Sequence, residues 1–526
     1  MRLTIALSSG PLRYTLRTRT PISFTKYHRY SSTKPQHQSL LTLAIETSCD
    51  DTCVAILEKS GPAARLHFNK RIPSNHVEFK GIHPTVASKT HEIQLAKLVN
   101  EALQSLPPPT TSPSTKTLPI LNPHIGTSTP RRLPDFVSVT RGPGFPGCLS
   151  TGLSLAKGLS VAWQVPLLGV HHMQGHALTP RLAHALSQPF PPLPSPPSSP
   201  PTNSTTLSPS FPLLTLLASG GHTQLLLSTS LTSHTILANT SNISLGDMLD
   251  KAARTILPPT LLSSLPDISY ASALEQFAFP PTTTTTQTRT YNYTPPPSRQ
   301  HETLPVPLPT PLFKPGYTLT PPLQSSKEMS FNFSGFGGQV QEIAQWYPYS
   351  KTDRINAASS SPLVPDLNTE QRRVLAQETM RLAFEHLASR VVFALRELQP
   401  VSESDKKYGT GRDDLARLKK LLEGNQKIGT LVLSGGVAAN KFLRHVLRTI
   451  LDRRGWPDIQ LAAPPVSLCT DNAAMIAWAG MEMWETEGVE TDLGVRAIRS
   501  WSLDESLGEE GTRGVMGVDG WVKRQL

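Results

Sequence analysis

Short apolar segments that end in loops of small or polar residues recur along this chain of 526 residues. Two of them, residues 213–218 and 429–433, run directly into the same Ser-Gly-Gly sequence. Segments with apolar residues at helical spacing, such as residues 369–398, lie between these runs. Strands that alternate with helices are typical of α/β folds. The repeated strand and Ser-Gly-Gly pattern indicates a duplicated architecture with one nucleotide-binding loop in each copy.

Other segments carry the same signals of strand and helix. Strands are predicted at residues 40–45, 53–57, 135–140, 165–170 and 224–228, and helices at residues 91–106, 149–163 and 471–484, with Thr90 as the cap of the first helix. The strand at residues 165–170 leads directly into a run that contains three histidines.

The chain contains 50 prolines and only 38% hydrophobic residues, but proline, serine and threonine are concentrated in a few segments. Residues 188–212 are almost entirely proline and serine, which predicts a disordered linker or insert between two lobes. We therefore expect an N-terminal lobe over residues 40–187, a C-terminal lobe over residues 213–502 and a tail over residues 503–526. Inserts are expected at residues 107–132, 257–329 and 402–426.

The N-terminus has the composition of a mitochondrial transit peptide. It contains seven arginines and lysines, many hydroxyl side chains and no acidic residue before Glu46. Segments rich in arginine and serine and poor in acids are typical of such peptides, so we expect cleavage near residue 35 (transit peptide, residues 1–35) and location in the matrix. The remaining 43 basic and 39 acidic residues give little evidence for RNA binding by charge alone. No apolar run approaches the roughly 18 residues that span a bilayer, so we expect no membrane association.

A pair of histidines is the clearest candidate for a metal site. His172 and His176 are four residues apart, so on a helix both imidazoles lie on one face. A carboxylate such as Asp471 would complete a three-ligand site with a position open for substrate. Histidine pairs without a ligand are also common, and no glutamate follows His172 to act as the base of a zinc protease. Two histidines and a carboxylate suit both zinc and iron(II).

The two Ser-Gly-Gly loops are candidates for nucleotide binding. Glycines directly after a strand let backbone amides approach a phosphate or a base. One such loop is more often a tight turn, but two in one chain, with Asn440 four residues after Gly436, favour a nucleotide site.

The polar turn of residues 46–52 offers hydroxyls for phosphate and acids that can orient a nucleophile, although an ordinary polar turn has the same composition. Cys49 and Cys53 could be metal ligands, but small buried thiols beside a tight loop explain them better. Together with Cys148 and Cys469, they show neither a CxxC pair nor disulfide-framework spacing, which fits a reducing compartment.

Taken together, seven segments resemble one family and occur in its order. They are residues 46–52 (ETSCDDT), 171–176 (HHMQGH), 219–224 (SGGHTQ), 247–251 (DMLDK), 333–335 (FSG), 434–440 (SGGVAAN) and 469–472 (CTDN). Over about residues 40–502, apart from the inserts, the chain is similar to the TsaD-type tRNA threonylcarbamoyladenosine transferases in their mitochondrial branch, formerly called glycoproteases.

The resemblance implies an actin-like, sugar-kinase-like ATPase fold, in which two related ribonuclease-H-like lobes hold a nucleotide and metal site between them. It implies an acyltransferase that moves a threonylcarbamoyl group from threonylcarbamoyl-AMP to the exocyclic amine of adenosine 37 in tRNAs reading codons that begin with A. The implied partners are tRNA, a separate synthase that supplies threonylcarbamoyl-AMP, and a second copy of the chain in a homodimer.

Residue by residue, the resemblance implies one divalent metal ion, zinc or iron, on His172, His176 and Asp471 of each subunit. The implied substrate-binding residues are Ala218, Ser219, Gly220, Gly221, His222, Gly435 and Gly436, with Asp250 and Asn440 at the ribose and base. The candidate catalytic residues are Asp50 and Glu46, and our hypothesis is that Asp50 accepts the proton of the adenine amine or orients the reacting groups. The metal as a Lewis acid and the amides of the glycine loops would stabilise developing charge.

Several positions depart from the family pattern. Gln174 and Asp51 stand where glutamate is usual, and Thr85 and Lys89 stand where glutamate and arginine are common. The Gly-Gly that commonly follows the helix of Asp250 is missing, and residues 258–265 occupy that place.

Two other functions fit part of these observations. An O-carbamoyltransferase acting on a small molecule would use the same metal and loops, and a non-catalytic tRNA-binding scaffold would keep the fold without turnover. The intact set of His172, His176 and Asp471 favours an enzyme, and the predicted transit peptide favours the tRNA reaction.

Overall fold

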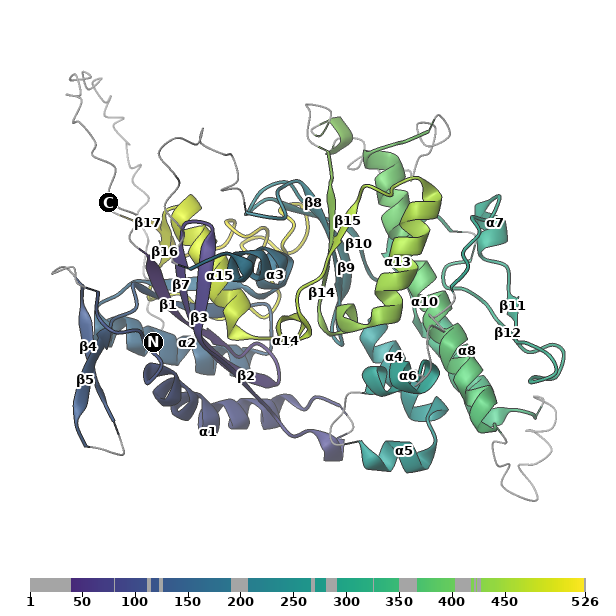
Figure 1. Ribbon diagram of the computed structural model, residues 1–526, viewed down its shortest axis with the longest axis horizontal. Coiled ribbons are helices and arrows are strands. Elements are labelled where there is room, and N and C mark those ends of the chain that lie inside the picture. Colours follow the sequence, from purple (N-terminus) through teal and green to yellow (C-terminus); the bar gives the residue numbers. More distant parts are fainter. Residues whose placement is uncertain are drawn as a thin grey trace, which may run out of the picture. The chain divides into compact units, whose positions relative to one another are not determined.

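The fold is organised by two β-sheets, which are seen in the computed structural model of the chain (Figure 1). The structure describes residues 39–79, 81–110, 115–122, 126–190, 207–265, 270–280, 291–324, 326–349, 367–402, 418–420, 422 and 427–524. The predicted transit peptide, residues 1–35, and most of the predicted segments 188–212 and 402–426 lie outside these ranges. Ser39–Leu526 forms one compact unit.

The first sheet has the strand order β3-β2-β1-β6-β7. Its strands are β1 (Leu40–Glu46), β2 (Asp51–Ser60), β3 (Ala63–Pro73), β6 (Phe136–Gly142) and β7 (Leu167–His171). The first three form an antiparallel meander, and β6 and β7 continue the sheet in parallel with β1. Every residue of β6 and β7 is buried, as is typical of parallel strands covered on both faces.

The second sheet has the order β13-β10-β9-β8-β14-β15. Its strands are β8 (Leu213–Ala218), β9 (Thr223–Ser228), β10 (His234–Thr240), β13 (Ser330–Phe331), β14 (Thr430–Ser434) and β15 (Gln460–Ala462). Again three consecutive strands form an antiparallel meander, and two later strands continue in parallel from the first of them.

This shared topology confirms the predicted duplication. The expectation of one Ser-Gly-Gly loop in each copy is wrong, however, because β8 and β14 are neighbours within the second sheet. In the first sheet, the equivalent positions are the turn of residues 47–50 after β1 and the loop that follows β6. The two glycine loops therefore lie at one sheet edge, where the carboxyl ends of parallel strands meet.

Helices cover both faces of the first sheet. They are α1 (Pro84–Leu103), α2 (Pro146–Trp163), α3 (His172–Ser187) and α15 (Ala473–Thr486). Ile45 packs in one core with Leu98 of α1, whereas its neighbour Ala44 packs in another core with Ile476 of α15. This alternation follows from the two-residue period of a strand.

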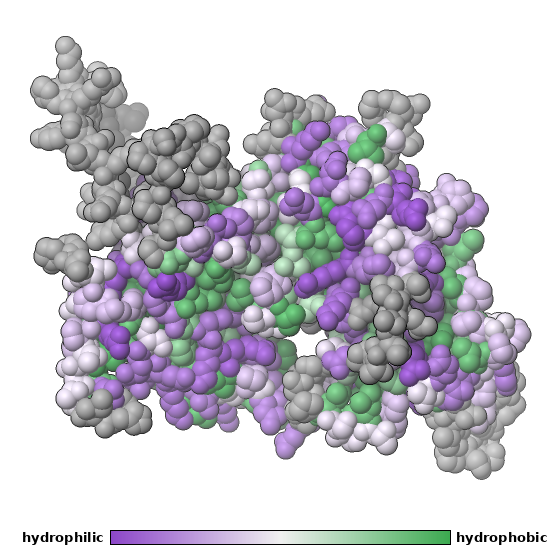
Figure 2. Space-filling model, in the orientation of Figure 1, coloured by the Kyte–Doolittle hydropathy of each residue, from purple (hydrophilic) through white to green (hydrophobic). Residues whose placement is uncertain are grey.

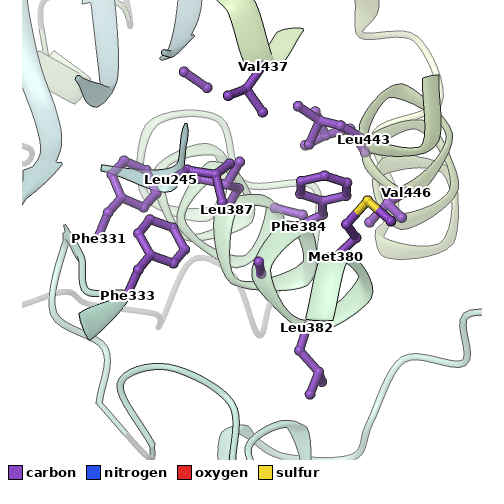
Figure 3. Close-up of a cluster of buried hydrophobic side chains, with 14 of the residues drawn as sticks. Leu245, Phe331, Phe333, Met380, Leu382, Phe384, Leu387, Val437, Leu443 and Val446 are labelled. Carbon is purple, nitrogen blue, oxygen red and sulfur yellow. The ribbon is translucent and has the colours of Figure 1, made fainter. Parts of the chain in front are cut away.

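The second sheet packs against α4 (Leu245–Ile256), α6 (Tyr270–Ala278), α8 (Ser334–Trp346), α10 (Thr369–Leu398) and α13 (Lys441–Arg454). Phe331 and Phe333 lie beside Leu387 of α10, and Met380 of the same helix lies beside Val446 (Figure 3). The bounds of α10 agree with the predicted helix at residues 369–398, and a capping box between Asn368 and Gln371 explains where it begins.

Helix α15 returns from the C-terminal part of the sequence to the first sheet. It contacts α3, β1 and β2, and its residues Ala473–Trp484 are buried on all sides. The following residues join both sheets, because Asp504 Oδ2 accepts a hydrogen bond from the backbone of Ile236 in β10 while the Trp501 carbonyl lies 3.1 Å from His171 Nε2. Part of the segment predicted as a tail is thus built into the core.

Some predicted boundaries differ from the structure. α1 begins at Pro84, about two turns before the predicted start at residue 91. Thr90 lies within the helix, where its hydroxyl bonds the Val86 carbonyl. The predicted insert at residues 257–329 supplies α6 and buried side chains such as Leu274 and Phe313 to the second core.

The remaining described elements are short. They are β4 (Thr117–Leu121), β5 (Ser128–Arg132), β11 (Val306–Pro307), β12 (Thr318–Leu319), β16 (Val489–Thr491), β17 (Trp521–Lys523), α5 (Pro259–Ser264), α7 (Arg299–Glu302), α14 (Val466–Cys469) and the 3-10 helices η1 (Val77–Phe79) and η2 (Gly436–Ala439). Within the described ranges, no helix combines the length and apolar character needed to cross a membrane. Hydrophilic residues are spread over the face shown in Figure 2, with hydrophobic residues in groups between them.

Candidate active site

His172 and His176 lie on the first turns of α3, directly after strand β7. The preceding residue, His171, is the N-cap of this helix, and its Nδ1 accepts a hydrogen bond from the backbone N–H of Met173 at 3.1 Å. The two imidazole rings meet edge to face with their centroids 4.8 Å apart. The strand-to-helix junction therefore places both predicted ligands on one face of the helix.

Asp471 reaches the same point from the turn between α14 and α15. Asn472 shapes this turn, since its side chain donates to the Thr470 carbonyl and accepts from the Met475 N–H as the N-cap of α15. Asp471 Oδ1 lies 3.0 Å from His176 Nε2 and 3.7 Å from His172 Nε2. One possible ligand atom from each of the three residues lies within 4.8 Å of the others. The structure thus brings together the triad predicted from the sequence.

Glu46 approaches His172 from the opposite side. Its carboxylate is 1% exposed and accepts hydrogen bonds from His172 Nδ1 at 3.1 Å, the Ser48 N–H at 2.5 Å and the Thr140 hydroxyl. A carboxylate on one ring nitrogen orients the other nitrogen toward a metal. Glu46, which was predicted to be catalytic, therefore contacts the ring nitrogen of His172 opposite the one that faces Asp471.

The charges of these groups favour a cation in the site. Burial lowers the pKa of His172, but the Glu46 and Asp471 carboxylates outweigh it and raise that pKa to about 9. Burial would raise the pKa of Asp471, yet His172 and the hydrogen bond from His176 hold it well below its usual range. Both carboxylates thus carry negative charge around the two imidazoles.

The first Ser-Gly-Gly loop is a tight turn between β8 and β9. The Ser219 hydroxyl accepts from the N–H groups of His222 at 3.0 Å and Gly221 at 3.3 Å. The Ser244 hydroxyl, at the start of α4, donates to the Gly220 carbonyl at 2.6 Å. Helix α3, which carries His172 and His176, contacts β8, the strand that ends in this loop. Desolvation lowers the pKa of His222, and the charges of His172 and His176 lower it further.

The second glycine loop abuts the first. Gly435 has φ +89°, and a Cβ at this position would lie 2.5 Å from the Ala218 carbonyl oxygen. Glycine is therefore required there by both conformation and space. At Gly220, Gly221 and Gly436, in contrast, an added Cβ would meet no atom within 4 Å, so these glycines border open space.

The predicted nucleotide residues Asp250 and Asn440 are held by neighbouring backbone. Asp250 Oδ1 accepts from the Ala271 N–H at 3.0 Å, and burial raises the pKa of this carboxyl to about 6 despite that hydrogen bond. Asn440 is the N-cap of α13, with its Oδ1 accepting from Leu443. The carboxylate of Glu275, from α6, accepts from the N–H groups of Lys441 and Phe442.

Helix α6 thus connects Asp250 with the start of α13, next to Asn440, and sequence reasoning missed this element. Residues 258–265, which stand in place of the usual Gly-Gly, contain α5, and α6 follows at Tyr270. The Arg254 guanidinium packs over the Tyr270 ring, 5.5 Å from its centroid. The signal that could have identified it is the apolar spacing of Ala273, Leu274 and Ala278, all of which are buried.

The acidic turn of residues 50–51 lies beside the triad. The Cys53 thiol is 3.6 Å from the Asp471 carbonyl oxygen. The Asp51 carboxylate pairs with Arg71 at 2.9 Å, whereas burial and the charge of Asp50 raise its pKa to about 7. All four cysteines are free thiols.

The fold and site define an α/β protein with two sheets of shared topology and a candidate metal triad beside two glycine loops. The model of the TsaD family, described as tRNA N6-adenosine threonylcarbamoyltransferase, matches residues 129–195, 201–295 and 305–478. The chain belongs to this family.

Its relatives include proteins from fungi and bacteria. The mitochondrial tRNA N6-adenosine threonylcarbamoyltransferase of Schizosaccharomyces pombe is 30% identical over 513 residues, which cover 94% of this chain and 92% of that protein. The tRNA N6-adenosine threonylcarbamoyltransferase of Brucella anthropi is 30% identical over 88% of this chain and 95% of its own length. The tRNA N6-adenosine threonylcarbamoyltransferase of Bartonella tribocorum is 28% identical over 90% of this chain and 99% of its own length.

Proposed function

We propose that this chain is a tRNA N6-adenosine threonylcarbamoyltransferase of mitochondria. It transfers the threonylcarbamoyl group of threonylcarbamoyl-AMP to the exocyclic amine of adenosine 37 in tRNAs that read codons beginning with A. The observation that carries the proposal is the convergence of His172, His176 and Asp471 in a chain of this family, with α3 in contact with the two strands that end in the glycine loops.

The three triad residues suit one divalent metal ion. Their donor atoms converge, two carboxylates supply negative charge, and Glu46 holds His172 with Nε2 toward Asp471. A metal ion bound there, zinc or iron, would act as a Lewis acid on carbonyl or phosphate oxygens of the substrate.

The residues of the chain have distinct tasks in this reaction. The open faces of Gly220, Gly221 and Gly436 let backbone amides approach the acyl-adenylate, while Asp250 and Asn440 hold its ribose and base. Because the acyl-adenylate is already activated, the remaining tasks are to place the amine and to accept its proton. Asp50 is our candidate for the group that accepts this proton or orients the reacting groups. It lies in the same turn as Ser48, whose hydroxyl is 3.2 Å from His172 Nδ1.

A transfer assay tests the proposal. Protein lacking residues 1–35 is incubated with an unmodified tRNA that reads a codon beginning with A and a synthase that makes threonylcarbamoyl-AMP, and nucleosides are analysed by mass spectrometry. We expect product from the unchanged protein and none from His172→Ala or Asp471→Ala. His184→Ala, which removes a histidine from the same helix outside the site, is the control and should retain activity.

The outcome also separates the other functions. Transfer to a small-molecule hydroxyl but not to tRNA would support an O-carbamoyltransferase. Folded protein with a metal content near zero and no turnover would support a scaffold. The proposed homodimer and matrix location are tested by sedimentation of the purified chain and by protease protection in isolated mitochondria.

A further inference from the structure

The loop between β3 and α1 is attached to the acidic turn of the site. The backbone N–H and the hydroxyl of Ser74 both donate to the Asp50 carbonyl, at 3.0 and 2.7 Å. In the same turn, the Ser48 hydroxyl lies 3.2 Å from His172 Nδ1. A short chain of contacts therefore links this loop to the metal triad.

The loop is also closed on itself by a buried histidine. His76 is 1% exposed, its Nδ1 accepts from the His83 N–H at 3.3 Å, and its carbonyl accepts from the Phe79 N–H at 3.0 Å. These bonds join His76 to the backbone of both Phe79 and His83.

What the loop presents is an aromatic surface. The Phe79 side chain is 49% exposed, and its ring lies against the His83 imidazole with a centroid distance of 4.7 Å and an angle of 39°. Ile82, between them in sequence, is 43% exposed. Within the described ranges, Trp346 is the other aromatic side chain among the exposed large hydrophobics, so an exposed phenylalanine is uncommon in this chain.

We infer that Phe79 and His83 form a stacking platform for an unpaired base of the tRNA anticodon loop next to the modified adenosine. This inference rests on the proposed function. Enzymes that act on a base take it out of its stack, and its neighbours then lose a stacking partner. Aromatic side chains replace that partner with little dependence on base identity, because every base has a π-face.

Continuity with the site favours RNA over a protein as the occupant of this surface. The loop that carries the platform contacts the turn of residues 47–50 at both ends. Ser74 donates to the Asp50 carbonyl. The Cys148 thiol lies 3.9 Å from the carbonyl oxygen of Pro84, the residue after His83, and the Cys148 carbonyl accepts from Thr47. Single-stranded loops are the parts of RNA whose bases are free to stack on aromatic residues.

The test uses an anticodon stem-loop RNA with 2-aminopurine at the position next to adenosine 37, because stacking quenches the fluorescence of this base. We expect quenching on binding to the unchanged protein, loss of quenching with Phe79→Ala, and its return with Phe79→Trp. The Kd for the RNA should rise roughly 5- to 150-fold in Phe79→Ala. Ile93→Ala, which truncates a 57% exposed side chain of α1, should change neither quantity.

The possible results are distinguishable. If Phe79→Ala binds and quenches like the unchanged protein while tRNA is still modified, the inference is wrong and the proposed function stands. If the unchanged protein neither binds nor modifies tRNA, both are wrong. If Phe79→Ala weakens self-association in sedimentation and leaves RNA affinity unchanged, the surface is a protein interface and the inference is again wrong.

Discussion

The Glu46 carboxylate accepts a hydrogen bond from Nδ1 of His172 at 3.1 Å, although the two residues are 126 positions apart in the sequence. This contact fixes the imidazole so that Nε2 points to Asp471, 3.7 Å away. Carboxylates in this position also raise the basicity of the imidazole ligand. Glu46 is therefore placed to support the proposed metal binding from the other side of His172.

We expect Glu46→Gln to lower metal affinity about 10- to 100-fold, because it keeps an acceptor for Nδ1 but removes the negative charge. The measurement is competition with a chelator of known affinity, read by metal analysis of the protein. The control is Glu58→Gln, a carboxylate in the same sheet that pairs with Arg132 away from the triad. Equal affinity in Glu46→Gln and the unchanged protein would contradict this role.

Gly435 and Gly436 allow a matched test of the second glycine loop. Gly435→Ala places a Cβ against the Ala218 carbonyl in a conformation with φ +89°, so we expect it to cost about 1–3 kcal/mol and to weaken nucleotide binding. Gly436→Ala introduces no contact and has no positive φ, so its unfolding free energy should stay close to that of the unchanged chain. Urea unfolding of both variants measures the difference, and similar losses in the two would argue against the strained-loop explanation.

How much of this arrangement was predictable differs from element to element. The helix at residues 369–398 could be read directly, since its cap and long apolar period are local signals. The triad was also predictable, because His172 and His176 share one helix face. By contrast, the apolar sequence of α15 indicates burial but not the sheet it packs on.

Tertiary contacts account for what the sequence analysis missed. The attachment of α6 to Asp250 through the Ala271 N–H depends on the fold and leaves no local pattern. The start of α1 was missed because Thr90 looks like a cap, whereas Pro84, which suits a first helical turn, marks the true beginning. The two glycine loops were assigned to different copies because strand order depends on tertiary contacts and is not visible in the sequence.

Asp51 should give the folding stability a specific pH dependence. Burial first, and then the charge of Asp50, raises its pKa from 3.8 to about 7, with Arg71 opposing the shift. Between these values the folded chain holds a proton that the unfolded chain has released, so the contribution of Asp51 to stability falls as the pH rises from about 4 to about 7.

Asp51→Asn removes this titration. Between pH 5 and pH 8, the unfolding free energy of the variant should fall by roughly 1–3 kcal/mol less than that of the unchanged chain. Urea unfolding at the two pH values checks this, with the exposed Asp458→Asn as a control that should keep the slope of the unchanged chain. An Asp51→Asn protein with an unaltered pH dependence would contradict the assignment.

His171 joins α3, the helix of the proposed metal ligands, to the C-terminal segment, since its Nδ1 caps α3 and its Nε2 lies 3.1 Å from the Trp501 carbonyl. Both contacts require a neutral ring with its proton on Nε2, and burial lowers its pKa well below the usual value, which keeps the ring in that form. We expect His171→Ala to cost about 0.5–2 kcal/mol through loss of the cap and to broaden the absorption bands of cobalt(II) bound in place of the native metal. His171→Asn keeps an acceptor for the Met173 N–H, so it should recover most of the stability and the spectrum. If the asparagine variant is as defective as the alanine variant in both measurements, the contact with Trp501, and not the cap, positions His172.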